Sequence, residues 1–176
     1  MNLVRCAGCK CELGWVAGSS DSICLYKWQT MCETTHQGCP PPTVVELLSA
    51  ALVSAASRFG TARFLVMTQH DESGPEQESV LYVWVLNDRL SYTSTFSAQR
   101  RAAAKVAFKT MTRREALKLL EPVGLTHHHE INFPQAAISD CVEALVEMNG
   151  KLPEDVRKFN ELDVSLLARW GRWEEF

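Results

Sequence analysis

The sequence predicts an α+β protein: a mostly antiparallel sheet covered by two amphipathic helices and preceded by a cysteine-rich β-unit. Three observations support this prediction. Residues 80–87 are a run of β-branched, aromatic and aliphatic residues closed by Asn87, which is typical of a strand. Residues 43–59 and 134–149 place apolar residues three and four positions apart, as a helix with one buried face does. Six of the seven cysteines precede the first proline, Pro40.

The run at residues 80–87 predicts a central strand, because both of its faces are apolar. Alternate residues of a strand point to opposite faces of the sheet. One face would carry Val80, Tyr82, Trp84 and Leu86, and the other Leu81, Val83 and Val85. Burying side chains of this size contributes roughly 1.5–3 kcal/mol each, so we expect both faces to be covered. The strand carries no catalytic residue type and therefore predicts a fold rather than an activity.

The composition is that of an ordinary soluble globular protein. The 176 residues are 46% hydrophobic and 22% charged, which suits one core with at most a small additional module. The formal net charge of -3 provides no broad basic field, so we expect no nucleic acid among the partners. No stretch approaches the roughly 18 apolar residues of a membrane span, and no charged leader precedes an apolar segment, so no membrane partner is expected. These features favour a cytoplasmic location and are compatible with a nuclear one.

The first two cysteines have the spacing of a zinc knuckle. In a reducing compartment, cysteines act as thiols or metal ligands more often than as disulfides. Cys6 and Cys9 are two residues apart, and Gly8 permits a tight turn between them. We therefore predict zinc as a cofactor, with Cys6 and Cys9 as two of four ligands. The other candidates are irregularly spaced: Cys32, His36 and Cys39. The pattern also fits a β-hairpin in which the cysteines are small buried residues.

A proline-rich break divides the chain into two parts. Residues 23–29 mix β-branched and aromatic residues in a short strand pattern. Residues 40–42 are three prolines, a stiff extended segment that separates this unit from the rest of the chain. We predict a cysteine-rich β-unit at residues 1–39 and an α+β domain at residues 40–176, packed together as one globule.

The larger part begins with a helix and a hairpin. Thr43 is the expected N-cap of a helix whose apolar stripe runs to Phe59 and stops at Gly60. Residues 63–67 predict a strand that pairs with residues 80–87 in a hairpin. The acidic loop between these strands is expected to be a solvated hairpin tip with no further role.

The middle of the chain contains one ambiguous segment. Residues 90–93 predict a further strand, and the polar residues 95–101 predict a loop. Residues 103–111 fit a helix, because of their alanines, and equally a strand, because of Val106 and Phe108.

The last third of the chain predicts two helices and a strand. Thr112 begins a capping box, which indicates a short helix. Three adjacent histidines at 127–129 cannot all face one point, so no metal site is predicted there. The helix at residues 134–149 carries Cys141 on its apolar stripe. Residues 162–166 alternate as a half-exposed strand.

The order of short motifs resembles a known family. They are the cysteine pair followed by Leu-Gly at 6–14, Leu-Tyr-Lys-Trp at 25–28, the strand at 82–87, Ala-Lys-Val at 104–106, Leu-Pro at 152–153 and Leu-Leu-Ala-Arg at 166–169. Together they resemble the HECT-like ubiquitin-conjugating-enzyme (E2)-binding family of ubiquitin-protein ligases. The likeness corresponds to the C-terminal half of the family, whose longer members add a β-rich half with a cysteine pair of its own. It implies that residues 104–108 are a strand.

The resemblance implies a ubiquitin-protein ligase, a transferase that binds a ubiquitin-conjugating enzyme and promotes ubiquitination of a protein client. True HECT ligases pass ubiquitin through a thioester on a cysteine. Such a cysteine must be accessible and benefits from a lowered pKa, whereas Cys141 is expected on an apolar stripe beside Asp140 and Glu143. The residues therefore show no convincing catalytic cysteine, and whether the protein is an enzyme stays open.

A non-catalytic binding or escort protein is the alternative. For this function the resemblance suggests the pre-mRNA 3′-end cleavage machinery as the client. An apolar surface left uncovered in the folded chain would favour it.

Overall fold

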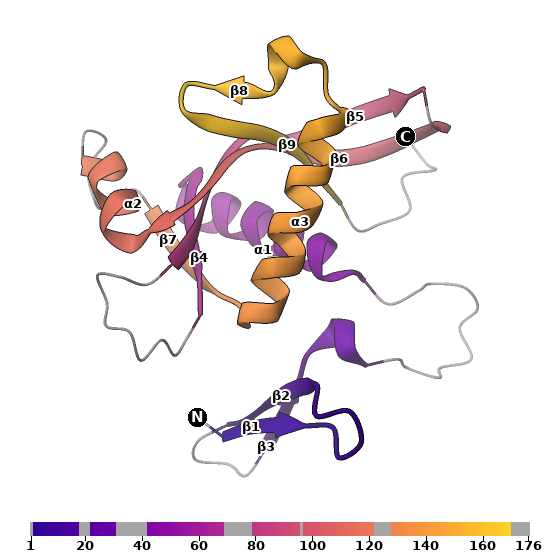
Figure 1. Cartoon of the computed structure of the whole chain (residues 1–176), viewed down its shortest axis with the longest axis vertical. Coiled ribbons are helices and arrows are strands. Elements are labelled where there is room, and N and C mark those ends of the chain that lie inside the picture. Colours follow the sequence, from indigo (N-terminus) through magenta and orange to yellow (C-terminus); the bar gives the residue numbers. More distant parts are fainter. Residues whose placement is uncertain are drawn as a thin grey trace. The chain divides into compact units, whose positions relative to one another are not determined.

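The computed structural model describes residues 2–17, 22–30, 42–68, 79–95, 97–121 and 128–169 (Figure 1). They fall into two units, Met1–Thr43 and Val44–Phe176. The smaller unit contains a three-stranded sheet, and the larger contains a six-stranded sheet with three α-helices. This confirms the predicted α+β class. The predicted limits at 1–39 and 40–176, and the packing of both parts as one globule, stay predictions.

The smaller unit is an antiparallel sheet in the order β1-β2-β3, followed by one turn of 3-10 helix. Its elements are β1 (Asn2–Arg5), β2 (Glu12–Ala17), β3 (Ser22–Leu25) and η1 (Lys27–Gln29). Gly14 lies in β2 opposite Leu25. A β-carbon at Gly14 would lie 1.9 Å from the carbonyl oxygen of Cys24, so a side chain does not fit there. Strands β2 and β3 therefore approach each other so closely at Gly14 that only glycine fits there.

The larger sheet has the order β7-β4-β5-β6-β9-β8, and only the β4–β7 pair is parallel. Its strands are β4 (Arg63–Met67), β5 (Ser79–Ser94), β6 (Ser97–Thr112), β7 (His128–Asn132), β8 (Lys158–Phe159) and β9 (Leu162–Ala168). The helices are α1 (Val44–Phe59), α2 (Arg113–Leu120) and α3 (Gln135–Lys151), with a 3-10 turn at η4 (Glu154–Val156). In Figure 1, α2 lies at the end of the β5–β6 hairpin opposite its tip.

Two hydrophobic clusters cover the two faces of this sheet, as the sequence predicts for β5. On one face, which we call the α1/α3 face, side chains of both long helices pack on the sheet; this cluster includes Leu48, Leu52, Phe64, Leu81, Val83, Val106, Cys141 and Leu145. The opposite face, the α2 face, buries Leu65, Val80, Tyr82, Ala107, Ala116, Leu120 and Leu162. Leu81, Tyr82 and Val83 are each at most 1% exposed, which confirms a central strand buried on both sides there. Trp84 and Leu86, also expected to be covered, are only half-buried.

The β5–β6 hairpin is longer than the sequence predicts. The expected loop at 95–101 is wrong in most of its length, because β6 begins at Ser97. Residues 90–93 belong to β5 rather than to a separate strand. The register of the β5–β6 pair shifts on either side of Asn87, as it does at β-bulges. Because of these shifts, Asn87 and Asp88 lie within one continuous strand and do not end it. The ambiguous segment 103–111 is a strand, because pairing with β5 and β9 outweighs the helical propensity of its alanines.

The helix ends follow the predicted signals, with one exception. Gly60 has a φ of 64°, which suits the residue after a helix, and its N–H donates to Ala56. The capping box is confirmed: the Thr112 N–H donates to the Glu115 carboxylate at 2.8 Å, and the Glu115 N–H donates to the Thr112 hydroxyl. The exception is Phe59, expected on the buried stripe but 56% exposed at the last position of α1.

Strand β9 is more deeply buried than predicted. We expected a half-exposed strand at 162–166, but Ser165 and Leu167 are buried as well, because β9 lies between β6 and β8. The Ser165 hydroxyl donates to the Leu145 carbonyl of α3 at 2.8 Å, which satisfies its polar group inside the core. Within the described ranges, no helix combines the length and apolar character that a membrane crossing requires.

Candidate functional site

Cys141 is a buried structural thiol. It lies on the inward side of α3, is 1% exposed and belongs to the cluster on the α1/α3 face, which confirms its predicted burial. Burial raises the pKa of the Cys141 thiol to about 12, and the charge of Asp140 acts in the same direction. A transthiolation nucleophile must reach a bulky donor as a thiolate. Cys141 meets neither requirement in the folded protein.

The first prediction concerns Cys141→Ala. The small cavity should reduce the free energy of unfolding by about 1 kcal/mol at pH 7. Folding raises the pKa of the Cys141 thiol from 9.0 to about 12. The protonated, buried thiol therefore contributes its full stabilisation below pH 9, and this contribution is lost as the pH rises toward 12. Between pH 9 and 10 the wild-type protein should therefore lose about 1 kcal/mol more stability than the variant.

Urea titrations of both proteins at pH 7, 9 and 10 measure this difference. Cys11→Ala is the matched control, since Cys11 is exposed and should leave the pH dependence unchanged. Parallel pH profiles for wild type and Cys141→Ala would contradict the assignment of a buried, protonated thiol.

Cys6 and Cys9 form a tight turn at the end of β1. The Cys6 N–H donates to the Cys11 carbonyl at 2.9 Å, and the Lys10 N–H donates to the Cys6 carbonyl at 3.0 Å. Lys10 adopts a positive φ of 62°, a conformation more common for glycine. Hydrogen bonds from the backbone amides of Cys9 and Gly8, and then from the Cys9 side chain, lower the pKa of the Cys6 thiol. The hydrogen bonds of the turn therefore stabilise the ionised form of the Cys6 thiol relative to that of an isolated cysteine.

This turn suits half of a soft-metal site. Thiolates held by backbone amides are the ligands that Zn²⁺ prefers in closed tetrahedral sites. The further ligands predicted from the sequence, Cys32, His36 and Cys39, lie outside the described residues. Within the described part of the chain, no three His, Cys, Asp or Glu residues gather closely enough to hold a metal. Zinc binding at Cys6 and Cys9 stays a prediction.

The described histidines are on strand β7. His128 and His129 are neighbours in the strand and therefore point to opposite faces of the sheet. The His129 ring stacks on Phe59 at a centroid distance of 4.2 Å. His127 lies outside the described residues. The two described histidines thus cannot ligate one metal ion together.

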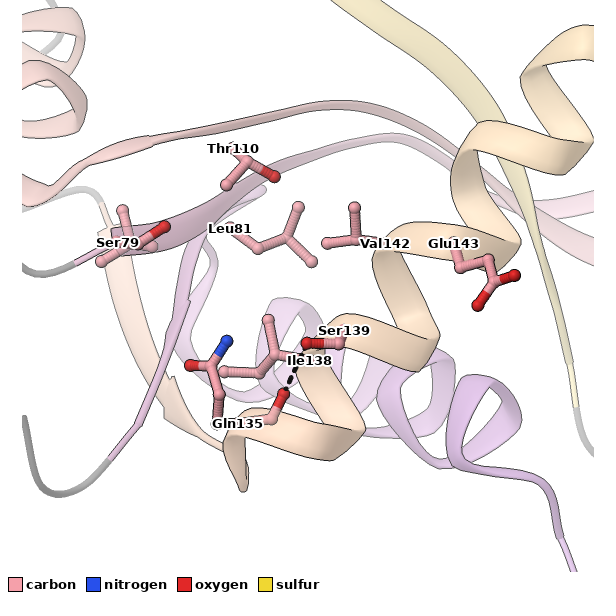
Figure 2. Close-up of a pocket in the computed structure, with 9 residues that line it drawn as sticks. Ser79, Leu81, Thr110, Gln135, Ile138, Ser139, Val142 and Glu143 are labelled. Carbon is pink, nitrogen blue, oxygen red and sulfur yellow. Dashed lines mark hydrogen bonds between the residues drawn. The ribbon is translucent and has the colours of Figure 1, made fainter.

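A pocket of about 300 Å³ opens between α3 and the start of the β5–β6 hairpin. Figure 2 shows its lining side chains coming from β5, β6 and the first half of α3. The apolar residues are Val80, Leu81, Ile138 and Val142, and the polar ones are Ser79, Thr110, Gln135, Ser139 and Glu143. The Ser139 hydroxyl donates to the Gln135 carbonyl at 3.1 Å, within the same helix. The pocket combines an apolar wall with a polar rim.

The chemistry of this pocket is that of a binding site. Among the described residues that line it there is no cysteine, histidine or lysine, and Glu143 is the ionisable one. Val142 points toward Leu81 across the opening (Figure 2). It is only partly buried where it packs against the cluster on the α1/α3 face. Such a pocket fits one apolar side chain of a partner and offers hydrogen bonds around it.

The sequence did not reveal this pocket. Its residues come from three segments that are far apart in the chain, and each contributes an ordinary alternation of polar and apolar residues. Val142 counts as a core position by helical spacing, yet it is half-buried and lines the pocket. A pocket assembled from three separate segments leaves no pattern in one sequence.

One comparison with known proteins gives a result. A family model described as HECT-like Ubiquitin-conjugating enzyme (E2)-binding matches residues 1–164, which include residues of both units. No curated protein and no solved structure matches the chain.

Proposed function

This chain belongs to the HECT-like ubiquitin-conjugating enzyme (E2)-binding family, and from that premise we propose that it promotes the transfer of ubiquitin from a bound conjugating enzyme to a protein client. The resemblance seen in the sequence is thereby confirmed, and the family name implies binding of a conjugating enzyme. The observation that carries the proposal is the length of the match, which runs from the first strand of the smaller unit into β9.

The proposal assigns the protein a non-covalent route. The buried Cys141 thiol, with its pKa of about 12, is a poor acceptor of ubiquitin. The chain would instead hold the charged conjugating enzyme while a client lysine attacks the thioester directly. The thioester bond between ubiquitin and the conjugating enzyme breaks as an amide bond forms on the client. The leaving thiolate stays on the conjugating enzyme.

The pocket between α3 and the β5–β6 hairpin is the proposed anchor point for the conjugating enzyme. Anchoring apolar side chains in a partly desolvated pocket contribute most of the affinity of many interfaces. Ile138 and Val142 supply the apolar wall, and Gln135 and Thr110 can hydrogen-bond the rim of a partner.

The second prediction tests this anchor with Val142→Arg. An arginine in the pocket should lower the affinity for the conjugating enzyme by more than tenfold, because it fills the space for the partner side chain with a charge. Val146→Arg is the matched control, since Val146 lies on the same helix, is 57% exposed and does not line the pocket. Titrations of labelled conjugating enzymes, charged and uncharged, against both folded variants measure the effect.

Three outcomes separate the alternatives. Faster discharge of ubiquitin to lysine with the wild-type chain, lost in Val142→Arg, supports the proposal. Binding of a client from the 3′-end cleavage machinery without any effect on discharge would favour the non-catalytic escort. A wild-type chain that binds no conjugating enzyme, charged or uncharged, would overturn the proposal.

We also propose zinc at Cys6 and Cys9, and less than one zinc per chain under reducing conditions would argue against it.

A further inference from the structure

In the described part of the chain, one half of the α2 face has no helix over it. Helix α2 packs on the half that includes Tyr82, where its Ala116 and Leu120 are buried. Farther along β5, Trp84 and Leu86 are only half-buried and pack at the margin of the cluster. The Phe159 ring meets the Trp84 ring edge-on at 5.4 Å, but is itself 40% exposed. Beyond this contact and the Arg63 guanidinium, which lies over the Trp84 ring, the described residues provide no cover for this half of the sheet.

Two further cations lie on this half. Strand β6 pairs with β9 without a shift from Ala103 to Phe108, and with β5 without a shift from Arg101 to Ala103. Lys105 and Arg101 therefore point to the same face as Ala107, which is part of the α2-face cluster. The cross-strand partners of Lys105 are Asn87 and Leu166, and that of Arg101 is Tyr92. Neither cation forms an ion pair within the described part of the chain. Their charges are therefore not neutralised by an ion pair with a described acidic side chain.

These cations alternate with apolar and aromatic side chains. We call the surface the basic strip and define it by Trp84, Leu86, Tyr92, Arg101, Lys105 and Leu166. All but Arg101 are half-buried, so each of these side chains leaves part of its surface accessible. The register gives neither cation an acidic cross-strand partner. The strip is a positively charged surface on a chain whose net charge is -3.

From this arrangement we propose that the basic strip binds an extended acidic segment of a protein partner that also carries apolar side chains. Charge complementarity identifies the occupant: the two unpaired cations attract carboxylates, and the leucine and aromatic side chains between them accept aliphatic groups. This surface is separate from the pocket on the opposite face, and the inference does not depend on the proposed function.

The contacts that the Trp84 ring already makes favour a peptide over a nucleic acid as the ligand of the basic strip. Single-stranded nucleic acid binds on open aromatic rings, which stack against the bases. The Arg63 guanidinium already lies over the Trp84 ring, 4.4 Å from its centroid, and the ring edge contacts Phe159. The remaining surface is largely aliphatic and suits leucine or valine side chains better than bases.

The spacing of the cations defines a probe. Lys105 and Arg101 are four residues apart on one strand, which is about 13 Å. An extended peptide with glutamate at every fourth position has the same spacing, and leucine midway between the glutamates points to the same side. The probe is a fluorescein-labelled peptide with three repeats of Glu-Ser-Leu-Ser. Two control peptides replace all glutamates by lysine or all leucines by serine.

The third prediction is that the full chain binds this probe in fluorescence anisotropy and that Arg101→Glu together with Lys105→Glu weakens binding by about tenfold or more. Arg100→Glu is the matched control, because Arg100 is exposed and adjacent in sequence but points to the opposite face. Its affinity should stay within about twofold of wild type, as should the melting temperature of all variants. Both control peptides should bind more weakly than the probe.

Several results would overturn the inference. They are equal loss of binding in Arg100→Glu, no loss in the double variant, or tighter binding of a twelve-nucleotide oligouridylate than of the probe. If the double variant does not fold, Arg101→Glu alone gives the test, because its side chain is exposed. Methyl and indole resonances of Leu86, Leu166 and Trp84 should shift when the probe is added to wild-type chain, and unchanged resonances would likewise contradict the proposal.

Discussion

Replacing Gly14 by alanine is expected to unfold the sheet of the smaller unit. The added β-carbon would lie 1.9 Å from the Cys24 carbonyl oxygen and 2.9 Å from the Leu25 Cα, so β2 and β3 would have to separate. Both neighbours are backbone atoms of a paired strand, which cannot turn aside as a flexible side chain would. A three-stranded sheet is close to the lower limit for independent stability, and it cannot absorb such a distortion.

Backbone amide resonances measure this fourth prediction. Signals of residues 2–30 should lose their dispersion in Gly14→Ala, while those of the larger unit should stay dispersed. Gly8→Ala is the control, because its β-carbon would meet only the Cys6 sulfur at 4.0 Å. A well-dispersed spectrum for the Gly14 variant would show that the strands tolerate a side chain at this position.

The fifth prediction is that Leu145→Ala lowers the free energy of unfolding of the larger unit by about 2–5 kcal/mol. Leu145 is fully buried in the cluster on the α1/α3 face, where removal of three carbon atoms leaves a cavity. This loss is a large fraction of the total stability of an ordinary domain. Urea denaturation followed by circular dichroism gives the difference.

The next residue in α3 provides the control. Val146 is 57% exposed, and alanine has the higher helical propensity, so Val146→Ala should change stability by less than about 0.5 kcal/mol in either direction. Equal destabilisation by the two substitutions would mean that the inward face of α3 has been assigned wrongly.

The strongest sequence patterns predicted the larger sheet well. Residues 80–83 are buried on both sides as their composition requires, and the helical stripes of α1 and α3 pack on one face of the sheet. These predictions depend on local periodicity, which a single sequence displays directly. The extension of β5 through Asn87 could not be predicted in this way, because the bulges that carry the strand past that residue exist only in the pairing with β6.

The candidate sites were less predictable for a related reason. The turn at Cys6 and Cys9 is local, so its spacing was visible in the sequence, whereas zinc binding there stays a prediction. The pocket and the basic strip each combine residues from several strands or helices, so they depend on register and packing angles. The burial of Cys141 was predictable because helical spacing alone puts it on the apolar stripe.

The two edges of the larger sheet limit how this protein can assemble. At one edge, β8 has only two residues, Lys158 and Phe159, and at the other, β7 is a five-residue strand in which polar side chains outnumber apolar ones. Short or polar edge strands discourage the addition of a further strand from another molecule. Self-association through a continuous intermolecular sheet is therefore disfavoured along both edges. A complex that involves these two edges is therefore expected to form through side-chain contacts, whose affinity single substitutions can tune without disturbing the backbone ladder.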